Sequence, residues 1–327
     1  MEITLDSLFT DVLDIPSLSE IRKYLTFSTA FPESMRGHET VNSIREIMKI
    51  SPHWNPGSML NGLQALRNLG EKQSQILYPI YGADEIARQP ELKNAAVMYF
   101  PAGTDTAPYS MILAGGAFRC VCSLAEGFST AAQINKRGYH AFVVNYRVGL
   151  EPLMPKPIDD LARAIAFIRK HHDMFHVKPD RYAVIGFSAG GNIICTYCSD
   201  LAGYAKYGLP KPEIAVPVYA ATRIISSNND VSRLLYGNLP EPYQSQLEIL
   251  PHCSNFPPSY IVACLDDHTV PPDHAYHLSR ALAENGIPHH LEFGAHGGHG
   301  FGTGEGTSVS GWTNRAIDFW QKISEDL

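Results

Sequence analysis

The stretch "YAVIGFSAGGNIICTY", residues 182–197, decides the fold class of this chain. A short apolar run ends at Gly186, a lone serine follows two residues later, and an apolar stretch with helical spacing comes after it. A G-x-S-x-G between a strand and a helix is typical of a nucleophile elbow. Small neighbours relieve the crowding of its strained turn, and the helix N-terminus behind the hydroxyl favours negative charge. The pattern predicts Ser188 as a nucleophile, with a chance match in a glycine-bearing turn as the alternative.

On both sides of this stretch, short apolar runs alternate with helical patterns. Strands are expected at 75–81, 95–100, 109–114, 140–146, 182–187, 214–220, 259–265 and 289–293. Helices are expected at 157–172, 272–286 and 313–323. Several strands are continuous runs rich in valine and isoleucine, which suits strands that are covered on both faces. The alternation predicts an α/β fold with a mostly parallel central sheet and helices on both faces.

Two regions interrupt the alternation. Residues 1–70 look helical and are interpreted as an N-terminal extension of a catalytic domain over 71–327. This arm could mediate contacts in a homodimer. Residues 221–257 are long, polar and contain several prolines, which predicts a lid or cap segment, with a surface excursion as the alternative.

Composition limits the classes of partner. The chain has 327 residues, of which 44% are hydrophobic and 18% charged, so a sizeable core is available. The net charge of −7 opposes binding to nucleic acid or to anionic membranes. The first residues lack the positive and apolar regions of a secretory signal, and no apolar run reaches the roughly 18 residues that span a bilayer. We therefore expect a soluble cytoplasmic protein with a small-molecule substrate.

The six cysteines are few for a chain of this length, so a disulfide scaffold is not expected. Cys195 and Cys198 form a C-x-x-C within an apolar helical stretch. This spacing is compatible with a redox pair or a metal site, but cysteines in such a stretch are usually small buried hydrophobes.

A serine nucleophile needs a base and an acid, and both follow in the chain order Ser, acid, His that such elbows use. Asp266 and Asp267 come directly after the apolar run 259–265. His296 and His299 lie in the glycine-rich loop that follows the next strand, and glycine lets such a loop reach back to the serine. The H-x-x-H could instead bind a metal, but no carboxylate or thiol is close in sequence.

At these motifs the chain resembles the α/β-hydrolases of the acetyl esterase/lipase group, which are related to the hormone-sensitive-lipase-like esterases. The stretches that carry the resemblance are "KPDRYAVIGFSAGGNI", "LDDHTVPPDHAYHLSRAL" with its D-x-x-V-P, "GGHGF", and "NYRVGLEPLMPKPIDDLARAIAFIRKH". The resemblance covers about residues 95–325. It implies an α/β-hydrolase fold, with Asp267 as the triad acid in preference to Asp266 and His299 as the base in preference to His296.

These esterases often carry H-G-G-G before the elbow, and its backbone N–H groups form the oxyanion hole. The matching stretch here is "LAGGAF", residues 113–118, with Ala114 in place of the histidine and Ala117 in place of the third glycine. Oxyanion donors are main-chain groups, so the function can survive these changes. The resemblance implies Gly116, Ala117 and Ala189 as the oxyanion hole, and a plain tight turn is the alternative.

The resemblance implies serine-dependent hydrolysis of carboxylic esters through an acyl-enzyme. The motifs bring Phe118 and Phe301 close to the reacting carbonyl, and the polar segment 221–257 offers no broad apolar face for a lipid surface. Short-acyl esters are therefore expected, with acetylated carbohydrates or other small esters as substrates. Neither a metal nor an organic cofactor is implied. One alternative is a serine peptidase of the prolyl-oligopeptidase type, although 70 N-terminal residues are too few for the β-propeller of such enzymes. Another is a non-catalytic, ligand-binding protein with a hydrolase fold, which the intact Ser188, Asp267 and His299 argue against.

Overall fold

The computed structural model describes residues 2–25, 42–49, 51–73, 75–149, 153–224, 232, 235–237 and 239–325. These residues form an eight-stranded sheet in the order β1-β2-β4-β3-β5-β6-β7-β8. The strands are β1 (Leu77–Pro79), β2 (Ala96–Phe100), β3 (Ala107–Leu113), β4 (His140–Asn145), β5 (Val177–Phe187), β6 (Ile214–Val218), β7 (Ser259–Cys264) and β8 (His289–Gly294). The pairs β1–β2 and β2–β4 are antiparallel, and all further pairs are parallel.

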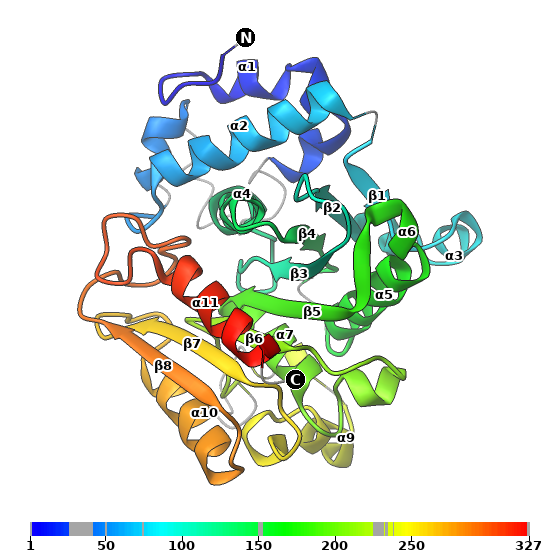
Figure 1. Ribbon diagram of the computed structural model, residues 1–327, viewed down its shortest axis with the longest axis vertical. Coiled ribbons are helices and arrows are strands. Elements are labelled where there is room, and N and C mark those ends of the chain that lie inside the picture. The colour runs from blue at the N-terminus through cyan, green and yellow to red at the C-terminus, as the bar shows by residue number, and fades with distance from the viewer. Residues whose placement is uncertain are drawn as a thin grey trace.

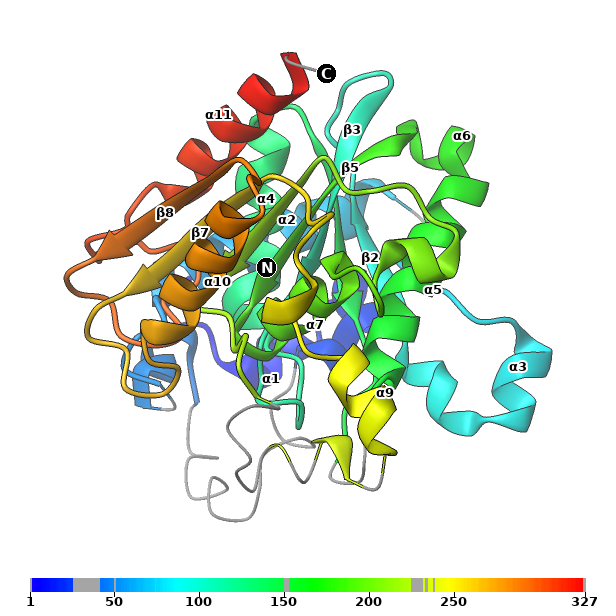
Figure 2. The ribbon, with the colours of Figure 1, turned by 90° about the horizontal axis from the view of Figure 1, so that it is seen from below.

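Helices cover both faces of the sheet (Figures 1 and 2). On one face, α4 (Phe128–Lys136) and α11 (Trp312–Glu325) pack against the sheet, and α2 (Pro56–Lys72) packs on the outer side of α4. The other is packed by α5 (Lys156–Lys170), α7 (Ser188–Cys198) and α10 (Asp273–Glu284). The shorter elements are α1 (Phe9–Leu13), η1 (Pro16–Tyr24), η3 (Ile44–Lys49), α3 (Ala83–Arg88), η4 (Pro90–Asn94), η5 (Ser123–Gly127), α6 (His172–Phe175), η6 (Tyr204–Tyr207), α9 (Glu241–Gln246) and η7 (Leu250–His252).

The central strand β5 shows why the strands read as continuous apolar runs. Val184 belongs to the hydrophobic core on the α7 side of the sheet, and its neighbours Ala183 and Ile185 belong to the core on the α4 side. Both faces are therefore buried, as parallel strands between helices require. The predicted mostly parallel sheet with helices on both faces is confirmed. β5 begins earlier than predicted, because Val177 pairs with Ala107 of β3 beyond a break in register.

The N-terminal residues pack on the α4 side of the sheet. Helix α2 begins after Asn55, whose Oδ1 accepts a hydrogen bond from the Ser58 N–H at 3.0 Å. A Cβ atom added to Gly62 of α2 would lie 2.8 Å from the backbone nitrogen of Ser129, so glycine allows α2 and α4 to approach closely. The division of the chain at residue 70 stays a prediction. Parts of the predicted lid 221–257, at 225–231, 233–234 and 238, lie outside the described residues.

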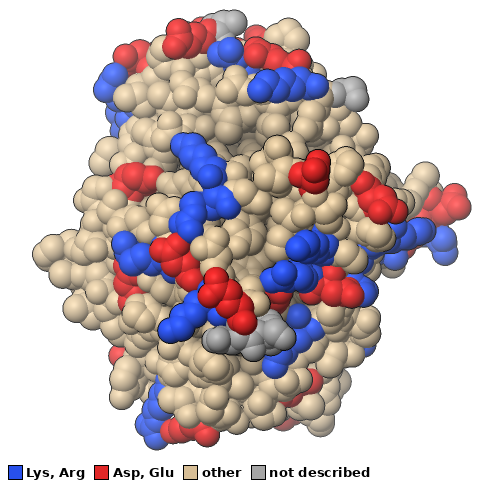
Figure 3. All heavy atoms as spheres, viewed as in Figure 1, with Lys and Arg blue, Asp and Glu red and all other residues tan. Residues whose placement is uncertain are grey.

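Three features concern the expectations on membrane spans, on charged partners and on the C-x-x-C. Among the described residues, no helix has both the length and the apolar character needed to cross a bilayer. On the face shown in Figure 3, acidic and basic side chains are interspersed. Cys195 and Cys198 lie fully buried in α7 as free thiols, and this burial raises the pKa of both well above its ordinary value. A thiol with a raised pKa forms little thiolate, which disfavours the redox interpretation of the C-x-x-C.

Candidate active site

The turn between β5 and α7 holds Ser188 in a strained conformation. Its φ angle is 50°, in the left-handed region that residues with a side chain seldom adopt. A Cβ atom on Gly186 would lie 2.4 Å from the carbonyl oxygen of Gly190, and one on Gly190 would lie 2.2 Å from that of Leu113. The glycines therefore let the start of α7 press against the ends of β5 and β3. This packing is what holds the serine in the strained turn.

Ser188, His299 and Asp267 form a continuous hydrogen-bonded chain. His299 Nε2 lies 2.9 Å from Ser188 Oγ, and His299 Nδ1 lies 2.7 Å from Asp267 Oδ2. The Asp267 side chain is fully buried, and its other oxygen, Oδ1, accepts hydrogen bonds from the N–H groups of Thr269 and Val270, both at 2.9 Å. These two bonds leave Oδ2 for the histidine. The structure thus brings together the three residues that were predicted as a triad.

The neighbouring acid and histidine have different partners. Asp266 accepts hydrogen bonds from the N–H groups of Gly298, at 2.8 Å, and Gly297, at 3.1 Å, so it holds the histidine loop in place. Burial raises the pKa of Asp266, but these backbone hydrogen bonds outweigh it and keep the pKa below its ordinary value. The His296 side chain is 86% exposed, and its Nδ1 lies 3.8 Å from Asp266. Neither residue is part of the chain of hydrogen bonds to Ser188.

The loop after β3 orients the N–H groups that were predicted as oxyanion donors. The carbonyl of Gly115 accepts a hydrogen bond from the Cys122 N–H, and the carbonyl of Gly116 accepts one from the Arg119 N–H, both at 2.9 Å. In a planar trans peptide the following N–H points the opposite way, so the N–H groups of Gly116 and Ala117 point away from these donors. Within the described part of the chain, neither of the two N–H groups is bonded to an acceptor.

This loop lies directly against the serine. A Cβ atom on Gly115 would be 2.9 Å from the Ser188 Cβ. Ala117, which replaces the third glycine of the family motif, keeps a left-handed conformation with φ 52°. Ala189 is the second residue of α7, where the backbone N–H has no acceptor within the helix. The three predicted donors therefore come from two segments that meet at Ser188.

Sequence reasoning missed two residues of this site, Glu126 and Tyr219. Glu126 is buried, and its Oε2 accepts a hydrogen bond from the Gly115 N–H at 2.5 Å, while its Oε1 accepts one from the Tyr219 hydroxyl at 2.9 Å. The Tyr219 hydroxyl in turn accepts the N–H of Gly302 at 3.1 Å. A signal was present in the sequence, because Glu126 is the only charged residue between Arg119 and Lys136.

The histidine loop also contacts the N-terminal part of the chain. Glu305, six residues after His299, accepts hydrogen bonds from Ser58 Oγ at 2.5 Å and from Gln133 Nε2 at 2.7 Å. Its backbone carbonyl accepts a third from Asn55 Nδ2 at 3.2 Å. Residues at the start of α2 therefore help to hold the loop that carries the histidine.

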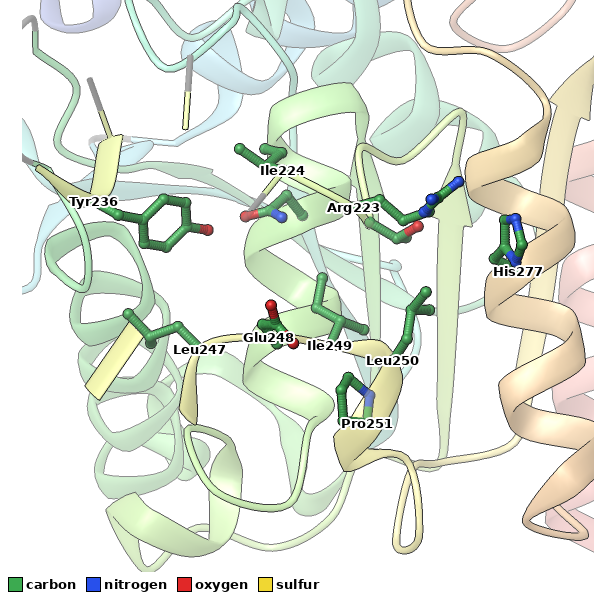
Figure 4. Close-up of a pocket in the computed structure, with 11 residues that line it drawn as sticks. Arg223, Ile224, Tyr236, Leu247, Glu248, Ile249, Leu250, Pro251 and His277 are labelled. Carbon is green, nitrogen blue, oxygen red and sulfur yellow. The ribbon is translucent and has the colours of Figure 1, made fainter. Parts of the chain in front are cut away.

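A pocket of about 260 Å³ lies beside α7 and is lined in part by Arg223, Tyr236, Glu248 and His277 (Figure 4). Asn192, one helical turn after Ser188, also lines it. The Nδ2 of Asn192 donates to a backbone carbonyl, and the Asn192 side chain also interacts with the hydroxyl of Tyr236. Groups that donate and accept hydrogen bonds therefore line this pocket, which suits a ligand that carries hydroxyl or N–H groups.

Known proteins resemble this chain over part of its length. Residues 97–204 match the model of the BD-FAE family. The endo-1,4-beta-xylanase B of Butyrivibrio fibrisolvens is 27% identical over 220 residues, covering 62% of this chain and 34% of that protein. The acetylxylan esterase of Xylanibacter ruminicola is 26% identical over 205 residues, covering 58% of this chain and 40% of that protein. This chain therefore spans less than half the length of either relative.

A solved structure shows the same fold. The acetyl ester-xyloside bifunctional hydrolase from Caldicellulosiruptor lactoaceticus superimposes with a TM-score of 0.65 at 23% identity, covering 76% of this chain and 96% of that chain. Together with the sheet order, this likeness confirms the α/β-hydrolase fold that the resemblance implied.

Proposed function

Since the chain is an α/β-hydrolase with esterases among its relatives, we propose that it hydrolyses carboxylic esters through a serine-bound acyl intermediate. The observation that carries this proposal is the hydrogen-bonded chain from Ser188 Oγ through His299 to Asp267, at the strained turn before α7. Nucleophile, base and orienting acid lie within hydrogen-bond distance of one another, as this chemistry requires.

In the proposed reaction, Ser188 Oγ attacks the acyl carbon while His299 Nε2 accepts the hydroxyl proton. Asp267 accepts the hydrogen bond of the Nδ1–H, which keeps the ring in the tautomer that can act as base, and it stabilises the imidazolium. The bond to the alcohol oxygen then breaks as His299 returns the proton to that oxygen. Water, activated by the same histidine, hydrolyses the acyl-enzyme.

The negative charge on the carbonyl oxygen is greatest in the tetrahedral intermediates. The N–H groups of Gly116, Ala117 and Ala189 are the proposed donors to this oxygen, and each donor of this kind is worth about 3 kcal/mol of transition-state stabilisation. Neither a metal nor an organic cofactor takes part in this proposal. The described residues contain no cluster of three or more histidine, cysteine or acidic side chains that could hold a metal ion.

Short acyl groups and carbohydrate alcohols are the proposed substrates. Phe118 directly follows the oxyanion residues, and Phe301 packs its ring 4.5 Å from that of Tyr219; both phenylalanines are buried. We propose that these two rings narrow the acyl site, which favours acetyl-to-butyryl groups over long chains. The pocket beside α7, which Asn192 and Tyr236 line with polar groups, supports an alcohol that carries further hydroxyls. An acetylxylan esterase among the relatives supports the same substrate class.

A panel of p-nitrophenyl esters from acetate to palmitate tests the acyl preference, and release of acetate from acetylated xylo-oligosaccharides tests the alcohol. We expect the highest kcat/KM at two to four carbons, and loss of nearly all activity in Ser188→Ala. A Ser188→Ala variant that keeps more than a few per cent of kcat would contradict the assignment of the nucleophile. An optimum at eight or more carbons would contradict the short-acyl preference alone.

A further inference from the structure

A buried carboxylate with no part in the proposed reaction lies beside its centre. Glu126, in η5, is 3% exposed. A Cβ atom on Gly115 would lie 3.3 Å from Glu126 Oε2 and 2.9 Å from the Ser188 Cβ, so the carboxylate is separated from the serine by a single glycine. Neither proton transfer nor oxyanion stabilisation needs an acid at this position.

Glu126 joins the three segments that build the site. Its Oε2 holds the N–H of Gly115, at the start of the oxyanion loop. Its Oε1 accepts the hydroxyl of Tyr219, which follows β6, and that hydroxyl accepts the N–H of Gly302 in the histidine loop. The Tyr219 ring meets the His299 ring edge to face, with the ring centroids 4.9 Å apart.

Both oxygens of Glu126 accept hydrogen bonds, which is the pattern of an ionised carboxylate. The Tyr219 hydroxyl receives the N–H of Gly302 and directs its own proton at Oε1, while the Gly115 N–H is directed at Oε2. Burial raises the pKa of Glu126, which means that keeping the ionised form inside the fold costs stability. Proteins retain such local costs mainly at functional sites.

We propose that Glu126 is a positioning residue, which holds the oxyanion loop through Gly115 and the histidine through Tyr219. This inference rests on the proposed esterase function of Ser188. Both polar groups of Gly115 are engaged, the N–H by Glu126 and the carbonyl by Cys122, so the peptide that carries the Gly116 N–H cannot rotate without breaking one of them. The same carboxylate fixes the hydroxyl end of the aromatic ring that supports His299.

The role predicts a specific kinetic signature. A misplaced oxyanion donor weakens binding of the tetrahedral intermediate and leaves binding of the planar ester unchanged. Glu126→Gln keeps the shape of the side chain and removes its charge. If the new NH₂ group faces the Gly115 N–H, that contact is lost; if it faces Tyr219, the hydrogen bond is reversed and the tyrosine proton loses its acceptor. We expect kcat to fall about 100-fold, the loss typical of a misplacement by about 1 Å at a reacting centre, while KM changes less than about threefold.

The experiment compares Glu126→Gln, Tyr219→Phe and the wild-type protein. Rates are expressed per active site, titrated with a fluorophosphonate that labels Ser188 stoichiometrically, so loss of folded protein does not lower them. A second readout is Ki for a trifluoromethyl ketone, which Ser188 attacks to form a hemiketal with a charged oxygen. We expect Ki to rise in parallel with the fall in kcat/KM.

Glu213→Gln is the matched control. Glu213 is also a buried glutamate, and it accepts hydrogen bonds from Arg181 and Trp320, before the N-terminal end of β6 and so at the opposite end of the sheet from Ser188. This variant should change stability while kcat per titrated site and Ki stay unchanged. Tyr219→Phe removes a hydroxyl and keeps the ring, so it provides the test if Glu126→Gln does not fold.

The outcomes separate the two proposals. An active wild-type protein whose Glu126→Gln or Tyr219→Phe variant keeps kcat per titrated site within about threefold overturns the positioning role alone. A rise in KM at unchanged kcat, or an unchanged Ki for the ketone, overturns it as well. A wild-type protein that hydrolyses no ester, or a Ser188→Ala variant with full activity, overturns the proposed function and this inference with it.

Discussion

Substitution of Asp267 by asparagine changes one atom at the buried end of the proposed triad, and the structure determines how the amide must lie. Asp267 Oδ1 accepts the N–H groups of Thr269 and Val270. An amide NH₂ in that position would face two donors, so the asparagine oxygen must occupy it. The NH₂ then points at His299 Nδ1, in the position that Oδ2 holds in the wild-type protein. Nδ1 must accept this hydrogen bond, which places the ring proton on Nε2.

A proton on Nε2 removes the base, because Nε2 is the atom that must accept the proton of Ser188. The corresponding change in a serine protease costs about 10⁴ in kcat, or about 5 kcal/mol of transition-state free energy. The neighbouring carboxylate cannot replace the lost one, because Asp266 is bonded to the N–H groups of Gly297 and Gly298. We therefore expect close to the full loss of about 10⁴ for Asp267→Asn.

The assay is kcat for p-nitrophenyl acetate, with urea unfolding to show that the variant is folded. Asp266→Asn is the matched control, because it changes the adjacent carboxylate, which bonds the histidine loop but not His299. Its kcat should fall by about tenfold or less, which corresponds to the energy of one weakened hydrogen bond. If Asp266→Asn lost more activity than Asp267→Asn, the reasoning from hydrogen-bond geometry would be refuted. The same holds if Asp267→Asn kept a tenth or more of the wild-type kcat.

Three further results are expected. Gly190→Ala places a Cβ atom 2.2 Å from the Leu113 carbonyl oxygen, so the free energy of unfolding measured in urea should fall by about 1–3 kcal/mol and activity should fall with it. In the control Gly82→Ala, where the nearest atom lies 3.4 Å away, the free energy of unfolding should change by less than about 1 kcal/mol at full activity. Equal effects of the two substitutions would contradict the packing argument. Folding lowers the pKa of Asp266, so this carboxylate stabilises the fold fully above its ordinary pKa of about 3.9 and loses that contribution as the pH falls through the lower folded value. Asp266→Asn should therefore flatten the decline of Tm below about pH 4. An unchanged decline would contradict this role of Asp266. Glu305→Ala removes the acceptor of Ser58 Oγ in α2 and of Gln133 Nε2 in α4, so it should lower the free energy of unfolding by about 1–3 kcal/mol and also lower kcat/KM. An unchanged kcat/KM would show that the histidine loop does not depend on this contact.

The sequence by itself determined the features that depend on local spacing. The apolar runs, the glycines around Ser188 and the order of serine, acid and histidine are all properties of short windows, and each places a residue at the end of a strand or the start of a helix. Because parallel strands all end at the same edge of the sheet, these local placements were sufficient to predict the mostly parallel sheet and to propose the site residues at its edge.

Only the tertiary structure decided which side chains meet across long stretches of chain. The sequence pattern alone did not decide whether Asp266 or Asp267 is the triad acid, and the family resemblance favoured Asp267. The structure shows that Asp267 bonds His299, whereas Asp266 bonds the backbone N–H of Gly298 in the same loop. The bond between Glu126 and Tyr219 joins residues 93 positions apart, and that between Ser58 and Glu305 joins residues 247 apart. Local pattern carries no information on such pairs, because their contact depends on how the crossovers between strands bring distant loops to one edge of the sheet.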